Sequence, residues 1–230
     1  MEGRNVFGVT VGPPFTAPDG QLYVPTLFGN AQPESEVLHA HEIGYRIQAS
    51  ARLSFDIASF YNQYRNLITY GPITALVPGN PNGIAVLPLM NLLTAETHGV
   101  ELSATLAPIE AWRLIGGYSL LRGTVHGTPG TAAGSISVDG PQQQATVRSS
   151  HDLSRSATLT GQLRYVDAIP GVRSYLTADV HIAYRTDAGL ELTLTGQNLL
   201  DRQHAEQGSA FLETASEVPR AVYARVSRQF

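Results

Sequence analysis

Strict alternation of apolar and polar side chains is the feature that most constrains how this chain folds. Across residues 175–185 every second side chain is apolar, and most residues between them are polar or charged. The apolar members are Leu176, Ala178, Val180, Ile182 and Tyr184. Successive side chains of a β-strand point to opposite faces, so this segment is predicted to be a strand with one apolar and one polar face.

The same period recurs along most of the chain and predicts an all-β fold, an antiparallel meander of about nine long strands. The expected strands cover approximately 37–49, 53–70, 92–106, 112–125, 143–153, 158–165, 175–185, 190–197 and 220–230. Short turns at 50–52, 108–111, 154–156 and 186–189 join some of them, and longer loops at 71–91, 126–142 and 201–219 join others. Residues 1–36 are rich in proline and glycine, which predicts a loop region with short extended pieces at 6–11 and 21–28.

The connections and the chemistry of the two faces favour part of a transmembrane β-barrel. A run of about eighteen apolar residues, which a membrane-spanning helix needs, does not occur, whereas a barrel strand needs only about 9–11 alternating residues. Bacterial barrels have short periplasmic turns and longer extracellular loops, so residues 1–36 are expected to be extracellular. Lipid contact is expected for Leu176, Val180, Ile182, Leu192, Leu194 and Val226. The polar residues expected to face a wet lumen are Glu101, Arg148, Arg164, Asp179, His181 and Arg225.

Composition narrows the classes of function. The net charge is −4 and there is no basic run, so nucleic acid is not expected as a partner. A small outer-membrane barrel enzyme, a hydrolase or protease, and a soluble β-sandwich that binds a partner are the alternatives. Since nine strands is an odd number and bacterial barrels have even ones, the sheet is expected to be open or incompletely closed.

Five stretches carry a resemblance to a known family. They are 41–46 (HEIGYR), 53–64 (LSFDIASFYNQY), 97–102 (THGVEL), 196–202 (GQNLLDR) and the end of the chain from Val218 to Phe230. In this order and spacing they resemble the C-terminal part of a TonB-dependent outer-membrane receptor. The resemblance extends over residues 31–230 and makes 37–230 the C-terminal section of such a barrel.

The resemblance implies a barrel of about 22 strands with an N-terminal plug inside it. Such receptors import scarce nutrients, most often iron–siderophore complexes, across the outer membrane of Gram-negative bacteria. The expected partners are the TonB complex through the plug region, the lipid bilayer, a small iron-complex ligand and the barrel assembly machinery, which would read the terminal Phe230. Because the sequence contains neither a plug nor a signal peptide, it is expected to be a C-terminal fragment.

Candidate ligand-binding residues are Tyr70, His126 and His204, which lie at or beyond the ends of expected strands, where loops present aromatic and imidazole groups. The pair His39 and His41 invites a metal site, but Glu42 points to the other face of the strand, so no metal is expected. The segment 150–152 (SHD) is not a catalytic triad, because neighbouring strand residues face opposite sides. The chain is therefore expected to have no catalytic residues and no cofactor.

Overall fold

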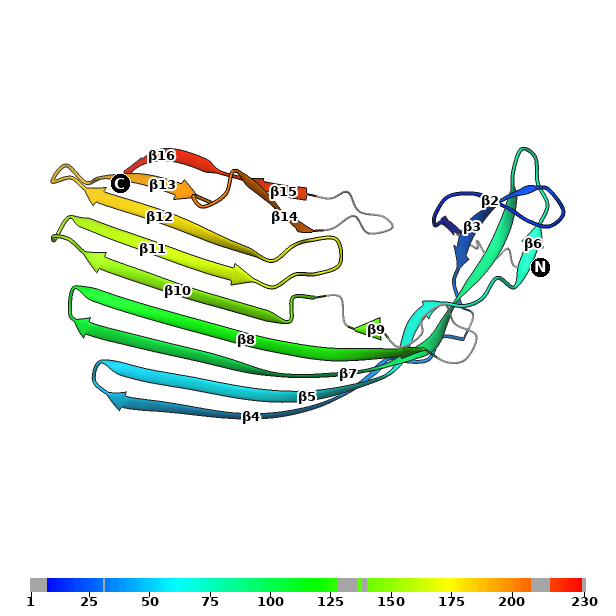
Figure 1. The fold of residues 1–230 in the computed structure, drawn as a ribbon, viewed down its shortest axis with the longest axis horizontal. Coiled ribbons are helices and arrows are strands. Elements are labelled where there is room, and N and C mark those ends of the chain that lie inside the picture. Colours follow the sequence, from blue (N-terminus) through cyan, green and yellow to red (C-terminus); the bar gives the residue numbers. More distant parts are fainter. Residues whose placement is uncertain (1–7, 31, 128–135, 138–139, 208–215, 229–230) are drawn as a thin grey trace.

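A nine-stranded antiparallel meander dominates the computed structural model, which describes residues 8–30, 32–127, 136–137, 140–207 and 216–228 (Figure 1). In sheet order the strands are β4 (Val37–Ser50), β5 (Leu53–Tyr70), β7 (Gly83–Ile109), β8 (Trp112–Gly127), β10 (Gln143–Asp152), β11 (Ala157–Val166), β12 (Tyr175–Arg185), β13 (Leu190–Gln197) and β16 (Ala221–Arg228). The alternating pattern predicted this meander and most of the strand ends, and both predictions are confirmed.

The strand register places apolar residues mostly opposite apolar ones, and polar residues mostly opposite polar ones, across the sheet. One continuous row of cross-strand partners contains Tyr45, Ile57, Leu102, Tyr118 and Ala145. Because side chains alternate along a strand, this register collects the apolar residues on one face, the apolar face, and the polar ones on the other, the polar face. The apolar face is uncovered: Ile43 is 76% exposed, and many other large apolar side chains on this face are exposed. A β-sandwich would bury this face against a second sheet.

The two ends of the meander differ. Tight turns join β4 to β5, β7 to β8, β10 to β11 and β12 to β13 at one end, the turn end, on the left of Figure 1. In the last of these, Gly189 has φ 76° and donates its N–H to the carbonyl of Thr186 (3.0 Å), as expected of a hairpin turn. The longer connections lie at the opposite end, the loop end, so the predicted asymmetry is confirmed.

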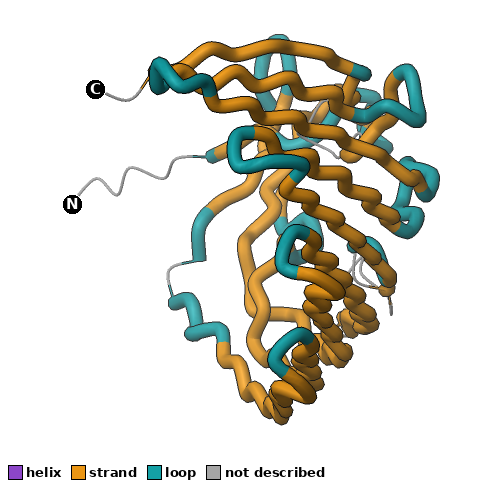
Figure 2. The backbone as a smooth tube through the Cα atoms, turned by 90° about the vertical axis from the view of Figure 1, so that its left-hand side faces the viewer, coloured by secondary structure: helices purple, strands orange, loops and turns teal. Residues whose placement is uncertain are grey.

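The sheet is curved and open. Figure 2, viewed from the turn end, shows the strands following an arc, with β4 and β16 at its two extremities. In the described part of the chain β4 pairs only with β5, and β16 only with β13. The expectation of an open sheet is therefore confirmed, and both outer strands present unpaired backbone groups.

The prediction of a plain loop at 71–91 and of a strand starting at 92 is wrong. Strand β7 already begins at Gly83 and runs beyond the meander, where it pairs with β6 (Ala75–Val77) and in parallel with β3 (Leu22–Phe28). Strands β1 (Val9–Thr10) and β2 (Phe15–Thr16) complete this extension, on the right of Figure 1. Its proline- and glycine-rich sequence looks like a loop, and only pairing with a distant segment makes it a sheet.

The extension has a buried core of its own. Tyr23 is 1% exposed and packs with Ala17 and Ala85, and Phe15 and Leu87 lie against them. A Cβ added at Gly83 would stand 2.5 Å from the Tyr23 ring, so the ring fits only because that residue is glycine. The Tyr23 hydroxyl donates to Asp19 (2.6 Å), which satisfies the polar end of a buried ring.

Phe60, the aromatic residue that breaks the alternation of β5, lies opposite Gly99 on the polar face. A Cβ at Gly99 would come 2.6 Å from the Phe60 ring and 2.3 Å from the Leu120 carbonyl oxygen. The Phe60 ring therefore lies against the backbone of Gly99, in space that the side chain of any other residue at position 99 would need. No helix among the described residues is long and apolar enough to span a membrane.

Candidate functional site

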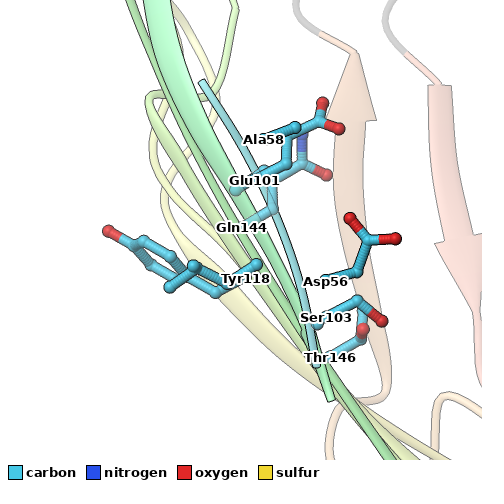
Figure 3. Close-up of a pocket in the computed structure, with 10 residues that line it drawn as sticks. Asp56, Ala58, Glu101, Ser103, Tyr118, Gln144 and Thr146 are labelled. Atoms are coloured by element: carbon cyan, nitrogen blue, oxygen red, sulfur yellow. The ribbon is translucent and has the colours of Figure 1, made fainter. Parts of the chain in front are cut away.

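A hollow of about 460 Å³ opens on the polar face of the meander, where β5, β7, β8 and β10 lie side by side. Its polar lining consists of Asp56, Glu101, Ser103, Ser119, Gln144 and Thr146. Figure 3 shows the carboxylates of Asp56 and Glu101 on the same side of the sheet as Gln144 and Thr146, with Tyr118 pointing to the other side. Gly117, which has no side chain, is the cross-strand partner of both Ser103 and Thr146.

The two carboxylates of this hollow differ in their partners. Asp56 forms an ion pair with Arg46 on the neighbouring strand β4. Glu101 has neither a hydrogen bond nor an ion pair with any described residue, and it lines open space. An ionised carboxylate surrounded by hydroxyl and amide groups can accept hydrogen bonds from a cationic or N–H-rich surface. The hollow can therefore bind a cationic or N–H-rich surface. Its lining residues do not include a nucleophile beside a general base.

A second cluster lies at the loop end of the polar face. Here β14 (Gln203–Gln207), paired with β15 (Ser216–Pro219), carries Glu206 to the meander. Glu206 forms an ion pair with Arg164 of β11 and accepts from the Tyr175 hydroxyl of β12 (3.4 Å). Arg164 lies over the Tyr175 ring at 5.5 Å, and the Tyr175 and His204 rings stack at 4.3 Å. These four residues, Arg164, Tyr175, His204 and Glu206, are called the rim cluster.

The electrostatics of the rim cluster favour an ionised Glu206. Partial burial opposes ionisation, but hydrogen bonds from Arg164 and His204 outweigh it and hold the pKa of Glu206 below its usual value. His204 Nε2 lies 3.3 Å from Glu206 Oε1, and the His204 side chain is almost fully buried. His204 Nδ1 is buried without a partner among the described residues. The cluster therefore fastens the β14–β15 hairpin to the wall of the sheet.

Asn198 anchors the other end of this hairpin. It is 1% exposed and has φ 52°, a left-handed conformation that asparagine tolerates better than most residues. Its backbone N–H donates to Asp179 Oδ1 (2.8 Å), and its Nδ2 donates to the Val218 carbonyl (3.0 Å). The sequence pattern predicted no role for Asn198. An asparagine directly after a strand and before a loop was the available signal.

The structure does not gather the three candidate ligand residues into one site. Tyr70, 51% exposed, ends β5 opposite Leu89, and His126 lies near the end of β8 opposite Thr94. These two positions along β7 are about 16 Å apart. His204 is 8% exposed and belongs to the rim cluster. Their role in ligand binding remains a prediction.

The six residues predicted to face a lumen all occupy the polar face. Glu101 lines the hollow, Arg164 belongs to the rim cluster, and Arg148 and Arg225 are exposed. Asp179 accepts from Asn198, and His181 Nδ1 lies 2.9 Å from Thr195 Oγ1. Ion pairs among the described residues do not join any two of the six.

The structure also positions the residues considered for a metal site and for a catalytic triad. Glu42 faces Phe60 on the polar face, whereas His39 and His41 share the apolar parity, and no group of three potential ligands comes together in the described ranges. His151 contacts Ser149 (2.9 Å) and stacks on Trp112, all on the apolar face at the turn end. Ser150 instead contacts Thr160 on the opposite face. Phe230 lies outside the described residues.

Comparison with known proteins gives one family. The model of the TonB dependent receptor-like β-barrel matches residues 9–199. Among solved structures, the siderophore receptor PirA of Acinetobacter baumannii superposes with a TM-score of 0.70 at 18% identity, covering 96% of this chain and 35% of that receptor. The pyoverdine outer membrane receptor FpvA of Pseudomonas aeruginosa gives 0.67 at 19% identity, covering 86% and 30%. The chain thus spans about a third of the length of these structures.

Proposed function

The chain belongs to the TonB-dependent receptor β-barrel family, and we propose that it forms part of the barrel wall of an outer-membrane receptor that imports an iron–siderophore complex. Members of this family are receptors and transporters of the Gram-negative outer membrane and are not enzymes. The observation that carries the proposal is the division of the nine strands into one uncovered apolar face and one polar face. A lipid-facing wall around a wet lumen requires this division.

The structural neighbours support the choice of substrate class. The solved receptors that this chain resembles are named for siderophores, pyoverdine and ferric enterobactin. In our proposal the rest of the wall and the plug are supplied by polypeptide that pairs with the open edges β4 and β16. The plug would engage the TonB complex, and the hollow at Asp56 and Glu101 would be part of the wall that it contacts. The assembly machinery would bind the aromatic C-terminus.

Ligand contact in this proposal comes from the loop end. Tyr70 and His126 are exposed there and can stack on or hydrogen-bond an iron complex. His204 is turned against Tyr175 and would act by holding its hairpin in place. The turn end would face the periplasm.

Uptake of radioactive ferric siderophore by cells that carry the receptor containing this chain tests the function. Substitution of Tyr70 and His126 by alanine is expected to lower uptake about tenfold, with normal amounts of receptor in the outer membrane. Asp187→Ala in the β12–β13 turn is the matched control and is expected to leave uptake unchanged. Unchanged uptake in the double variant, or surface labelling of a Gly189→Cys variant in intact cells, would overturn the assigned sites and orientation.

A further inference from the structure

A row of cationic and hydrogen-bonding side chains crosses the apolar face near its loop end. The register aligns His41 of β4, Tyr61 of β5, His98 of β7 and Arg122 of β8 as direct cross-strand partners. They share the parity of the apolar residues, so they point away from the polar face. These four residues are called the outer row, and all of them are exposed.

The outer row lies at a defined height on the wall. Its members are eight to eleven residues from the turn-end limits of their strands at Ser50, Leu53, Ile109 and Trp112. A transmembrane strand has about 9–11 residues, so the row stands one membrane thickness from the periplasmic turns. The next row toward the turns is largely apolar, with Ile43, Val100 and Leu120. The outer row therefore marks the boundary between lipid chains and the headgroups of the outer leaflet.

The chemistry of the row calls for an anion. Arg122 carries a permanent charge, and His41 and His98 offer imidazole N–H groups, whereas the Tyr61 hydroxyl interacts with the Glu96 carboxylate. None of the three nitrogen-bearing side chains has a hydrogen bond or ion pair with a described residue. The acid nearest on this face, Glu96, lies one row further out and accepts from Gln63 (3.4 Å). An arginine beside a lipid phase is costly unless an anion meets it there.

We propose that the outer row binds the phosphate of a phosphorylated lipid in the outer leaflet. A guanidinium binds phosphate through two parallel hydrogen bonds, and the neighbouring imidazoles can donate to the remaining oxygens. The acyl chains of the same lipid would lie on the exposed apolar side chains below the row. The inference rests on the proposed outer-membrane location and not on the iron–siderophore substrate.

The test uses the receptor that contains this chain, purified from outer membranes, with diphosphoryl lipid A as the probe. Retained lipid is counted by native mass spectrometry and by phosphorus per barrel. Arg122→Gln combined with His98→Gln is expected to lower retention about tenfold, the loss of roughly one charged hydrogen bond. Arg113→Gln, which removes the same charge from the polar face of the same strand, is the control and is expected to retain lipid normally.

Equal retention by the double variant and the control would overturn the proposal. So would equal binding of lipid A without phosphates, since the apolar face alone would then hold the lipid, or full competition by inorganic phosphate. If the double variant does not assemble, Arg122→Lys replaces it in the test. This variant keeps the positive charge but cannot form the two parallel hydrogen bonds to phosphate, so lipid retention must still fall. Siderophore uptake by the unsubstituted receptor is measured in parallel. If no uptake occurs, the proposed substrate is contradicted, whereas the conclusion on lipid binding is unaffected.

Discussion

The meander and the small extension solve the same problem of buried apolar surface in opposite ways. In the extension, Tyr23 is 1% exposed and is enclosed by Ala17, Ala85 and the backbone at Gly83. In the meander, Ile43 is 76% exposed, and Tyr45 and Ile47, which follow it on the same face of β4, are exposed as well. The extension carries its own core, whereas the meander depends on its surroundings to cover the apolar face.

This difference teaches which forces hold each region. Side-chain packing and one buried tyrosine fix the extension, so it should respond to cavities as a water-soluble domain does. Backbone pairing along nine strands holds the meander, and in the proposed barrel wall lipid covers its apolar face, so the meander should respond to charge on that face. Four substitutions test this contrast.

The largest effect is expected for Tyr23→Ala in the extension. Removing a buried aromatic ring costs about 3–5 kcal/mol, more than a small core can lose. Hydrogen exchange should then become fast in β1, β2, β3 and β6 while the meander keeps its protection. Tyr23→Phe, which removes only the hydroxyl bonded to Asp19, is the milder control. Loss of protection throughout the meander would contradict the independence of the two regions.

Val180→Arg should be the most damaging single change in the meander. Val180 lies midway along β12 on the apolar face, where an arginine costs about 2–4 kcal/mol if lipid surrounds it. Gln162→Arg, on the polar face of β11, is the control and should be tolerated, because it points into water. Asp179 would be a poor control since it accepts the Asn198 N–H. Equal urea midpoints for the two variants folded into vesicles would refute the orientation.

Asn198→Ala should have an intermediate effect, confined to the β14–β15 hairpin. It removes the bond to the Val218 carbonyl and forces alanine into a left-handed conformation, at a cost of about 2 kcal/mol. Asn198→Gly keeps the conformation available, so it should cost about half as much. Proteolysis of the segment after Asp201 measures the loosening. A larger cost for glycine than for alanine would show that the backbone conformation is not the limiting factor.

The smallest effect is expected for Glu206→Gln in the rim cluster, about 1 kcal/mol, because the ion pair with Arg164 is partly exposed to water. The pKa of Glu206 is lowered in the folded state, so its contribution is complete above the unfolded value of 4.5 and is lost as the pH falls through the folded value. Acidification below pH 4.5 should therefore loosen the hairpin in the unsubstituted chain. The glutamine variant should lack this pH dependence in hydrogen exchange.

Local alternation was enough to determine the meander. Because the side-chain period of a strand is two, the pattern of Leu176 to Tyr184 defines both a strand and its two faces, and opposite faces cannot be exchanged without moving every residue. The matching parity of neighbouring segments and the tight turns then define the antiparallel order. The polar-face positions of Glu101, Arg148 and Asp179 followed from the same rule.

Only the tertiary structure decided the features that depend on segments far apart in the sequence. The parallel pairing of β3 with β7 converts a proline- and glycine-rich stretch into a folded extension, and no local period announces it. The rim cluster brings Arg164 and Glu206 together across 42 positions, and the outer row joins four strands through their register. Alternation reports which face a side chain occupies. Which side chains meet on that face depends on strand register and on how loops fold back, and these are set by the whole sheet.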